Sequence, residues 1–217
     1  MILTMLSNAR LALALAALAA ASLLAASPVA GQPAGAAALN GPELLAALRG
    51  GGFILYFRHA DTDHRQNDTG MRSFDDCSNQ RLLTDRGRDH ARAIGEAIRA
   101  LEIPIGSVLA SPLCRTVETA TLAFGRAERS HAAREAGPAP PGSPERFGAL
   151  RGLLSTVPAT GTNTVIVGHA YPFYSLVGGQ FLEEGEAAVV RPDGAAFEVA
   201  ARVGLRQWRE MGFGPTR

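Results

Sequence analysis

Four side chains in this sequence have types and positions suited to chemistry on an anion. Arg58 and His59 stand together directly after a short apolar stretch, and Arg115 and His169 each follow another such stretch. The forked guanidinium of arginine matches phosphate and carboxylate oxygens. A neutral imidazole is a competent nucleophile near neutral pH. The four residues therefore indicate an anion-binding site that contains at least one candidate nucleophile.

Three buried strands are expected to position these side chains. They are Phe53–Phe57, Ser107–Ala110 and Thr164–Gly168, each a short apolar run bounded by turn residues. Helical segments separate them, so the crossovers should be right-handed and the strands parallel. The polar residues at their carboxyl ends then meet at one edge of the sheet, where ligands bind in open α/β sheets. Arg115 also falls in the first turn of a helix, where the backbone favours an anion.

The remaining elements complete an α/β prediction. We expect a three-layer α/β/α sandwich with a mostly parallel central sheet and an edge hairpin. Thr84 should cap a helix whose buried face includes Ala91, Ile94, Ile98 and Leu101. Further expected features are a short helix from Pro42, helix starts at Ser111-Pro112 and Ser143-Pro144, a short strand in Ser130–Arg134, a short helix from Pro172 and a hairpin of Ala187–Arg191 with Ala196–Ala201.

The composition is that of a globular protein with no bias toward nucleic acid. The chain has 217 residues, of which 47% are hydrophobic and 19% charged, and its formal net charge is +1. This balance indicates neither a nucleic-acid partner nor an anionic membrane surface. The sequence contains no lysine, so any anion clamp must use arginine, histidine or backbone N–H groups.

The amino-terminal segment predicts export. Residues 1–31 read as a signal peptide, with Arg10 before the apolar run Leu11–Ala26 and small residues after it. The run is short for a membrane span, which needs roughly 20 apolar residues. Residues 32–41 form a Gly/Ala/Pro-rich linker and residues 42–217 the folded domain. We expect a periplasmic or secreted protein; the alternative is anchoring by an uncleaved segment.

The chain has two cysteines, Cys77 and Cys114. In an exported protein an even count favours one disulfide. The alternative is a pair of buried free thiols. Cys114 could also be taken for a nucleophile, but no paired base is evident in the sequence.

Four motifs in order resemble the histidine phosphatase superfamily, the phosphoglycerate mutase-like proteins of branch 1. They are Arg58-His59-Ala60 after a strand, Leu83-Thr84-Asp85-Arg86-Gly87 at a helix start, Ser111-Pro112-Leu113-Cys114-Arg115-Thr116 with Glu118-Thr119-Ala120 behind it, and Gly168-His169 after a strand. The resemblance covers the chain from about Phe53 to its end. It implies a phosphoglycerate mutase-like fold.

The resemblance also implies residue roles. His59 would be the nucleophile that carries a phosphoryl group, and Arg58, Arg115 and His169 would form the phosphate pocket. Water would then hydrolyse the phosphohistidine. Such chemistry rests on positioning and positive charge, and it requires neither a metal nor another cofactor.

A carboxylic acid usually protonates the leaving group in this family. Glu135 lies between the second and third strand-end motifs, where many members carry that acid, but the Pro/Gly-rich stretch after it departs from the pattern. Asp61, Asp63 and Glu186 are alternatives, whereas Glu118 is expected to support its helix. A site without the acid would act best on substrates with good leaving groups.

Other histidines have less specific surroundings. Thr62 and His64 lie in the long polar stretch Ala60–Leu83, which we expect to be a functional loop, and both are candidate substrate-binding residues. The cluster of His59, Asp61, Asp63 and His64 matches no zinc-binding spacing, so no metal is expected. His90 and His131 are expected at the surface.

The sequence therefore predicts a metal-independent phosphomonoester hydrolase acting through His59. Its partner would be a small phosphorylated substrate, by family analogy an envelope sugar phosphate, and no obligate protein partner is evident. A non-catalytic phosphate- or phosphoglycan-binding member and a phosphomutase are the alternatives. A Ser–His hydrolase is disfavoured because the sequence has no G-x-S-x-G motif.

Overall fold

The computed structural model describes residues 39, 41–134, 140 and 143–213. The predicted signal peptide, nearly all of the predicted linker and Glu135 lie outside the described residues. A six-stranded sheet with the order β3-β2-β4-β1-β5-β6 forms the centre of the fold. Its strands are β1 (Ile54–Arg58), β2 (Ile105–Ala110), β3 (Glu128–Arg129), β4 (Asn163–Gly168), β5 (Ala187–Pro192) and β6 (Phe197–Val203).

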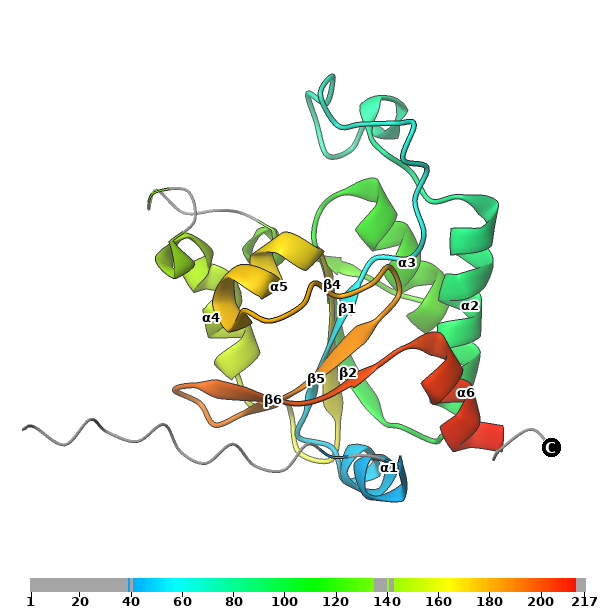
Figure 1. Ribbon diagram of the computed structural model, residues 1–217, viewed down its shortest axis with the longest axis vertical. Coiled ribbons are helices and arrows are strands. Elements are labelled where there is room, and N and C mark those ends of the chain that lie inside the picture. The colour runs from blue at the N-terminus through cyan, green and yellow to red at the C-terminus, as the bar shows by residue number, and fades with distance from the viewer. Residues whose placement is uncertain (1–38, 40, 135–139, 141–142, 214–217) are drawn as a thin grey trace, which may run out of the picture. The chain divides into compact units, whose positions relative to one another are not determined.

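Helices cover both faces of this sheet, as Figure 1 shows. The face of α2, α3 and α6 is opposite that of α4 and α5, and α1 lies near the amino-terminal ends of the parallel strands (Figure 1). The helices are α1 (Gly41–Gly50), α2 (Asp85–Ala100), α3 (Cys114–Phe124), α4 (Gly148–Ser155), α5 (Ala170–Val177) and α6 (Leu205–Phe213). The predicted three-layer α/β/α architecture is confirmed.

The pairing of the strands follows the predicted pattern. β1 to β4 pair in parallel, and β5 and β6 add an antiparallel hairpin at one edge. Parallel crossovers bring the carboxyl ends of β1, β2 and β4 to the same edge of the sheet. The strand-end motifs therefore meet, as the sequence predicted.

β1 is buried on both faces, which explains its continuous apolar sequence. Ile54 and Tyr56 pack into the core beneath α4 and α5, whereas Leu55 and Phe57 pack into the core beneath α2 and α3. Side chains alternate between the faces of a strand, so neither face of β1 could tolerate polar residues before Arg58.

The start of α2 is set by its cap. The Thr84 hydroxyl accepts a hydrogen bond from the Gly87 amide at 2.9 Å, as predicted for an N-cap. Arg88 of α2 donates to Glu118 of α3 at 2.7 Å, so Glu118 supports its helix as expected. The Arg88–Glu118 contact links the two helices whose amino-terminal ends flank the strand-end motifs.

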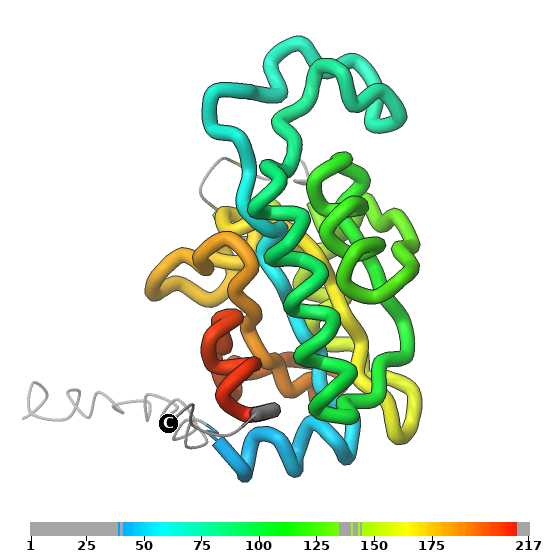
Figure 2. Tube along the Cα trace, turned by 90° about the vertical axis from the view of Figure 1, so that its right-hand side faces the viewer, coloured from blue at the N-terminus to red at the C-terminus, as the bar shows by residue number. Residues whose placement is uncertain are grey.

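The long polar stretch between β1 and α2 lies beyond the carboxyl ends of the strands (Figure 2). A disulfide between Cys77 of this loop and Cys114 ties it to the first residue of α3. The disulfide prediction is confirmed. Gln80, another residue of this loop, is buried, and its side-chain oxygen accepts a hydrogen bond from the Cys114 amide at 2.9 Å.

Two local predictions were wrong. Ser111 does not cap α3, which begins at Cys114 after an extended Leu113. The Ser111 amide instead continues the sheet by donating to Val167, and its hydroxyl contacts His169. The strand expected within Ser130–Arg134 is a 3-10 turn at His131–Ala133, because the short β3 ends at Arg129.

Ser143-Pro144 does begin a helical segment, first a 3-10 turn over Pro144–Phe147 and then α4. Among the described residues, no helix combines the length and the apolar character needed to cross a bilayer. The described part of the chain also holds no group of three or more acidic, histidine or cysteine side chains arranged for a metal ion.

Candidate active site

The end of β1 holds His59 against two other elements. The His59 amide donates to the Gly168 carbonyl of β4 at 3.1 Å. The next amide, that of Ala60, donates to the hydroxyl of Thr119 on α3 at 3.1 Å. Main-chain bonds on both sides therefore fix the position of a side chain that is only 2% exposed.

The His59 ring is held in one tautomer. Its Nδ1 lies 2.9 Å from the Ala60 carbonyl oxygen. A carbonyl can only accept, so Nδ1 carries the hydrogen and Nε2 keeps its lone pair. Burial lowers the pKa of His59 from 6.5 to about 3, and the positive charges of Arg115, Arg58 and Arg81 contribute to this shift. The imidazole is consequently neutral near pH 7.

His169 is positioned by a tyrosine of the core. The Tyr56 hydroxyl accepts from the His169 amide and donates to the His169 carbonyl, both at 2.9 Å. Gly168 permits this approach, because a Cβ there would lie 2.2 Å from the hydroxyl oxygen. Ser111 contacts His169 Nε2 at 2.8 Å. The rings of His169 and His59 face each other edge-on, with centroids 5.5 Å apart.

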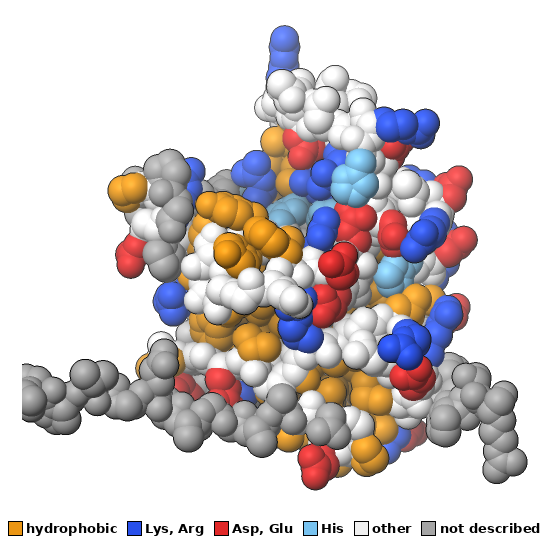
Figure 3. Space-filling model, viewed as in Figure 1, with side chains coloured by type: hydrophobic (Ala, Val, Ile, Leu, Met, Phe, Trp, Pro, Cys, Tyr) orange, Lys and Arg blue, Asp and Glu red, His pale blue; other side chains and the backbone are white. Residues whose placement is uncertain are grey.

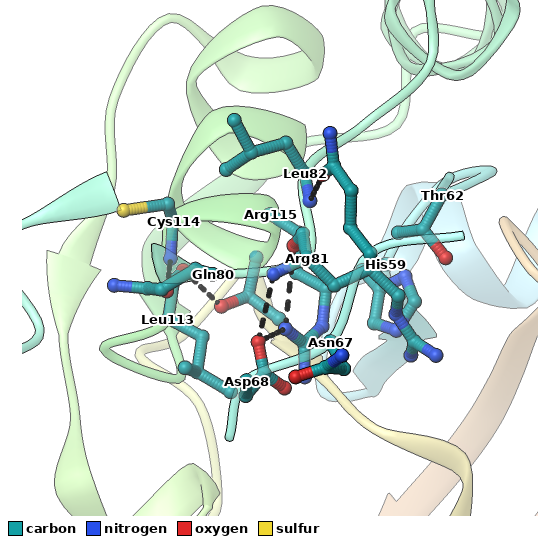
Figure 4. Close-up of polar contacts among 12 residues, drawn as sticks. His59, Thr62, Asn67, Asp68, Gln80, Arg81, Leu82, Leu113, Cys114 and Arg115 are labelled. Carbon is teal, nitrogen blue, oxygen red and sulfur yellow. Dashed lines mark hydrogen bonds and ion pairs between the residues drawn. The ribbon is translucent and has the colours of Figure 1, made fainter. Parts of the chain in front are cut away.

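Arg115 is buried at the start of α3 and contacts the long loop. Its guanidinium donates to the Asp68 carboxylate at 3.0 Å, and the Arg81 amide donates to the same oxygen at 2.9 Å. Figure 4 shows Asp68, Arg81 and Arg115 converging beside His59. Burial alone would raise the pKa of Asp68, but these hydrogen bonds and charges lower it overall.

Arg58 faces a carboxylate that sequence reasoning missed. Its guanidinium donates to the Leu182 carbonyl at 2.8 Å and lies 3.3 Å from Glu184. Thr62 donates to the same carboxylate through its hydroxyl at 2.6 Å, and His64 lies 3.6 Å from it. Thr62 and His64, the candidate substrate-binding residues, thus gather around Glu184.

The cavity beside these residues has a volume of about 510 Å³. Five arginines contribute to its wall, with both motif histidines and one carboxylate. The lining residues are Arg58, His59, Asp68, Arg81, Leu113, Arg115, Arg134, Arg146, Phe147, His169, Ala170, Tyr171 and Pro172. Basic and histidine side chains gather on this side of the molecule below the long loop (Figure 3).

Thr62 and His64 do not line this cavity. His64 lines a neighbouring hollow of about 320 Å³ with Asp61 and Glu184. A larger hollow of about 870 Å³ lies between the 179–186 segment and α6, and none of the motif residues lines it. We therefore take the 510 Å³ cavity as the candidate active site, since it alone of these three holds both histidines.

The alternative acids lie elsewhere. Glu186 pairs with Arg202 at 2.7 Å, and hydrogen bonds from Arg65 lower the pKa of Asp63 to about 2. Asp61 pairs with His90 at 2.6 Å, which also corrects the expectation that His90 lies at the surface. The His90 ring is half-buried because Asp61 holds it and Gly185 packs against it. None of these carboxylates lines the cavity of His59.

Sequence reasoning also missed Asp68 and the arginines at positions 81, 134 and 146. None of them follows a strand, so the argument from strand ends could not reach them. Arg81 did carry a signal, because it stands two residues before the motif Leu83–Gly87 at the end of a loop expected to cover the site. Glu135 cannot be placed, as it lies outside the described residues.

Residues 54–136 match the family model of the Histidine phosphatase superfamily (branch 1). The matched segment contains Arg58, His59 and Arg115, and the fold adds His169 to them. The match agrees with the resemblance that the motifs carry. No curated protein sequence matches this chain significantly.

A solved structure shares the fold at low sequence identity. Phosphoglycerate mutase from Bacillus anthracis is 11% identical, covers 76% of this chain and 99% of its own, and has a TM-score of 0.52. This similarity confirms the phosphoglycerate mutase-like fold.

Two further structures have TM-scores just below 0.5. The protein histidine phosphatase SixA complexed with tungstate is 19% identical, covering 71% of this chain and 97% of its own, with a TM-score of 0.49. A phosphoserine phosphatase mutant from Entamoeba histolytica, in complex with phosphoserine, is 11% identical, covering 71% and 98%, with a TM-score of 0.48.

Proposed function

We propose that this protein is a metal-independent phosphomonoester hydrolase that acts through a covalent phosphohistidine on His59. One observation carries the proposal: a buried, neutral imidazole keeps the lone pair of Nε2 in a cavity lined by five arginines. Nε2 attacks phosphorus and the ester oxygen leaves with the electron pair of the P–O bond. Water then attacks the phosphohistidine, releasing phosphate and restoring the imidazole.

The residues around His59 support this order of events. Arg58 and Arg115 supply donors for the phosphoryl oxygens, whose charge is spread over three positions in the transition state. His169, neutral because burial and nearby arginine charges hold its pKa well below 6.5, supplies a further polar contact. The leaving oxygen needs a proton, and Glu135 stays our proposed donor.

Asp68 is the only carboxylate among the described residues that line the cavity. Its hydrogen bonds with Arg115 and Arg81 hold it ionised, so its carboxylate accepts hydrogen bonds and has no proton to give. It is therefore a weaker candidate than Glu135 for the acid.

We also infer export, to the periplasm or outside the cell. The disulfide between Cys77 and Cys114 supports this inference, because such bonds persist in oxidising compartments. An envelope sugar phosphate is then a reasonable substrate to test. Cell fractionation with an antibody against the protein checks the location, and recovery in the cytosol alone would contradict it.

Hydrolysis of 4-nitrophenyl phosphate tests the proposed reaction. The purified protein and its His59→Ala variant are compared in EDTA, and protein-bound phosphate is trapped by an alkaline quench. We expect wild-type turnover that survives EDTA and falls at least about 10³-fold in the variant. Equal activity in the two proteins refutes the nucleophile, and phosphate binding without turnover favours the non-catalytic alternative.

A further inference from the structure

Glu184, in the segment between α5 and β5, has an acidic side chain that contacts the end of β1. The side chain is only 14% exposed, and it faces the hollow of about 320 Å³ rather than the cavity of His59. It is therefore no candidate for the acid that protonates the leaving oxygen. Its role must follow from the residues of the site that it contacts.

The main chain around Glu184 is bonded to both motif residues at the end of β1. The Gly185 amide donates to the carbonyls of Arg58 and His59 at 3.2 and 3.0 Å. The Arg58 amide donates to the Glu186 carbonyl at 3.0 Å. These bonds hold the backbone of Glu184 at a fixed place beside the nucleophile.

Donors also fix both oxygens of the Glu184 carboxylate. The Thr62 hydroxyl donates to Oε1 at 2.6 Å, and the Thr62 amide donates to Oε2 at 3.2 Å. Thr62 is itself buried and pairs with Leu83 in an isolated β-bridge. The carboxylate is thus oriented by the fold, without a bound substrate.

In this orientation Glu184 contacts Arg58. Its Oε1 accepts from the Arg58 guanidinium at 3.3 Å, and the Leu182 carbonyl accepts from the other terminal nitrogen at 2.8 Å. Two acceptors from one segment thus restrict a guanidinium that lines the cavity. An arginine that is ordered before the substrate arrives loses less conformational entropy on binding a phosphoryl group.

The same oxygen of Glu184 lies 3.9 Å from Nδ1 of His59. This distance is too long for a hydrogen bond, and Nδ1 already donates to the Ala60 carbonyl, but a charge acts across it. No other acidic side chain among the described residues pairs with this ring. The charges of three arginines, by contrast, disfavour a positive ring.

Phosphorylation of His59 makes the ring positive. The lone pair of Nε2 forms the P–N bond while the P–O bond breaks, and Nδ1 keeps its hydrogen on the Ala60 carbonyl. Burial disfavours the resulting cation, and a carboxylate beside Nδ1 offsets that cost. When water attacks phosphorus, the electron pair of the P–N bond returns to Nε2 and the ring is neutral again.

We propose that Glu184 is a positioning residue for phosphoryl transfer, which orients Arg58 toward the cavity and stabilises the positive charge of the phosphorylated His59 ring. The inference rests on the proposed function, since it concerns the same nucleophile. The charge of Glu184 stabilises the states in which Nε2 is bonded to phosphorus more than a complex in which a ligand only occupies the cavity.

Glu184→Gln isolates the charge, because the amide keeps the size of the side chain and an oxygen that accepts from Arg58. We expect kcat/KM for 4-nitrophenyl phosphate to fall about tenfold or more. Glu184→Asp, whose shorter side chain holds the charge farther from the ring, should lie between this variant and wild type. Glu183→Gln removes the same charge from the exposed neighbouring position and should retain the wild-type value.

Two inhibitors separate this effect from a purely structural one. Vanadate bonds to a nucleophile much as the transferring phosphoryl group does, whereas inorganic phosphate only occupies the cavity. We expect Glu184→Gln to raise Ki for vanadate at least about tenfold and Ki for phosphate less than about threefold. Both are measured without EDTA, which chelates vanadate, and urea unfolding verifies that the variant is folded at the assay temperature.

Three outcomes overturn the proposal: wild-type kcat/KM and vanadate Ki in Glu184→Gln, an equal weakening of vanadate and phosphate, or an equal loss in Glu183→Gln. If Glu184→Gln does not fold, the ratio of the two Ki values in Glu184→Asp decides, and a wild-type ratio overturns the proposal. Failure of the proposed function is distinct, because hydrolysis would then be independent of His59. His59-dependent hydrolysis with an unaffected Glu184→Gln leaves the reaction standing and removes only the role of Glu184.

Discussion

His59 illustrates how one residue acquires a chemical state from its surroundings. Its Nδ1 donates to the carbonyl of the next residue, Ala60, and the charges of three arginines act on the ring. The carbonyl fixes the tautomer, and burial together with the arginine charge suppresses protonation. An exposed histidine would be partly protonated at mildly acidic pH and would then lose its lone pair, whereas this one keeps it.

The lowered pKa of His59 predicts the direction in which the stability of the fold changes with pH. Its pKa is lowered from 6.5 to about 3 on folding, so between these values the unfolded chain binds more protons than the folded protein. The stability that depends on neutral His59 is therefore complete above pH 6.5 and is lost as the pH falls toward 3.

Histidine ring signals in NMR spectra can measure this pKa. We expect the His59 signals, assigned with His59→Ala, to remain constant from pH 8 to pH 5 in the folded protein. In urea the same ring should titrate near its ordinary value. A folded-state pKa at or above 6.5 would show that burial and the arginines do not act as described.

At the scale of elements, the loop between β1 and α2 brings groups to the site that no strand end provides. Asp68 and Arg81 belong to this loop, and both contact Arg115 at the start of α3. The Cys77–Cys114 disulfide attaches the loop to the residue just before Arg115. The bond thus constrains the geometry of the cavity as well as the unfolded chain.

Removing the disulfide should weaken substrate binding more than turnover. The paired cysteines are 37 residues apart, and loss of such a bond costs about 2–5 kcal/mol of stability. We expect Cys77→Ser with Cys114→Ser to raise KM for 4-nitrophenyl phosphate about tenfold, with a smaller change in kcat, when assayed well below the melting temperature.

Wild-type protein assayed after reduction provides the matched control, since it has no substituted side chains. It should reproduce the increase in KM, and reoxidation should reverse it. An unchanged KM in both cases would mean that Asp68 and Arg81 stay in place without the bond.

At the scale of the whole molecule, the sequence predicted the parts of the site that follow from sheet topology. Continuous hydrophobic runs in the sequence predict buried strands. Helical connections between them make these strands parallel, so their carboxyl ends lie at the same edge of the sheet. Arg58, His59, Arg115 and His169 could therefore be assigned to one crevice from the order of strands and helices alone. The hairpin of β5 and β6 was predictable for a similarly local reason, its turn sequence.

The remaining contacts depend on tertiary packing that no local pattern encodes. The sequence predicted Ser111 as a helix cap. Its amide instead continues the sheet, and its hydroxyl forms a hydrogen bond with His169. Glu184 lies 126 residues from Arg58 in sequence. The two side chains are in contact because the segment just before β5 runs beside the end of β1. Asp68 and Arg81 reach the site through a loop whose path the disulfide fixes.

Asn163 joins elements at the amino-terminal ends of the parallel strands, the end opposite to the site. Its side chain donates to the carbonyls of Leu48 and Pro104 at 2.7 and 3.0 Å, and it accepts from the Phe53 amide at 3.1 Å. These contacts connect the end of α1 and the segments that lead into β1 and β2. The residue is fully buried, so water cannot replace the bonds.

We therefore expect Asn163→Ala to lower the free energy of unfolding by about 2–4 kcal/mol without changing the denaturant m-value. Asn79→Ala, at an exposed position of the disulfide-linked loop, should change it by less than about 0.5 kcal/mol. Urea unfolding under non-reducing conditions measures both. A cost below about 1 kcal/mol for Asn163→Ala would mean that its backbone partners find other donors and acceptors, and that the amino-terminal ends of the strands hold together without it.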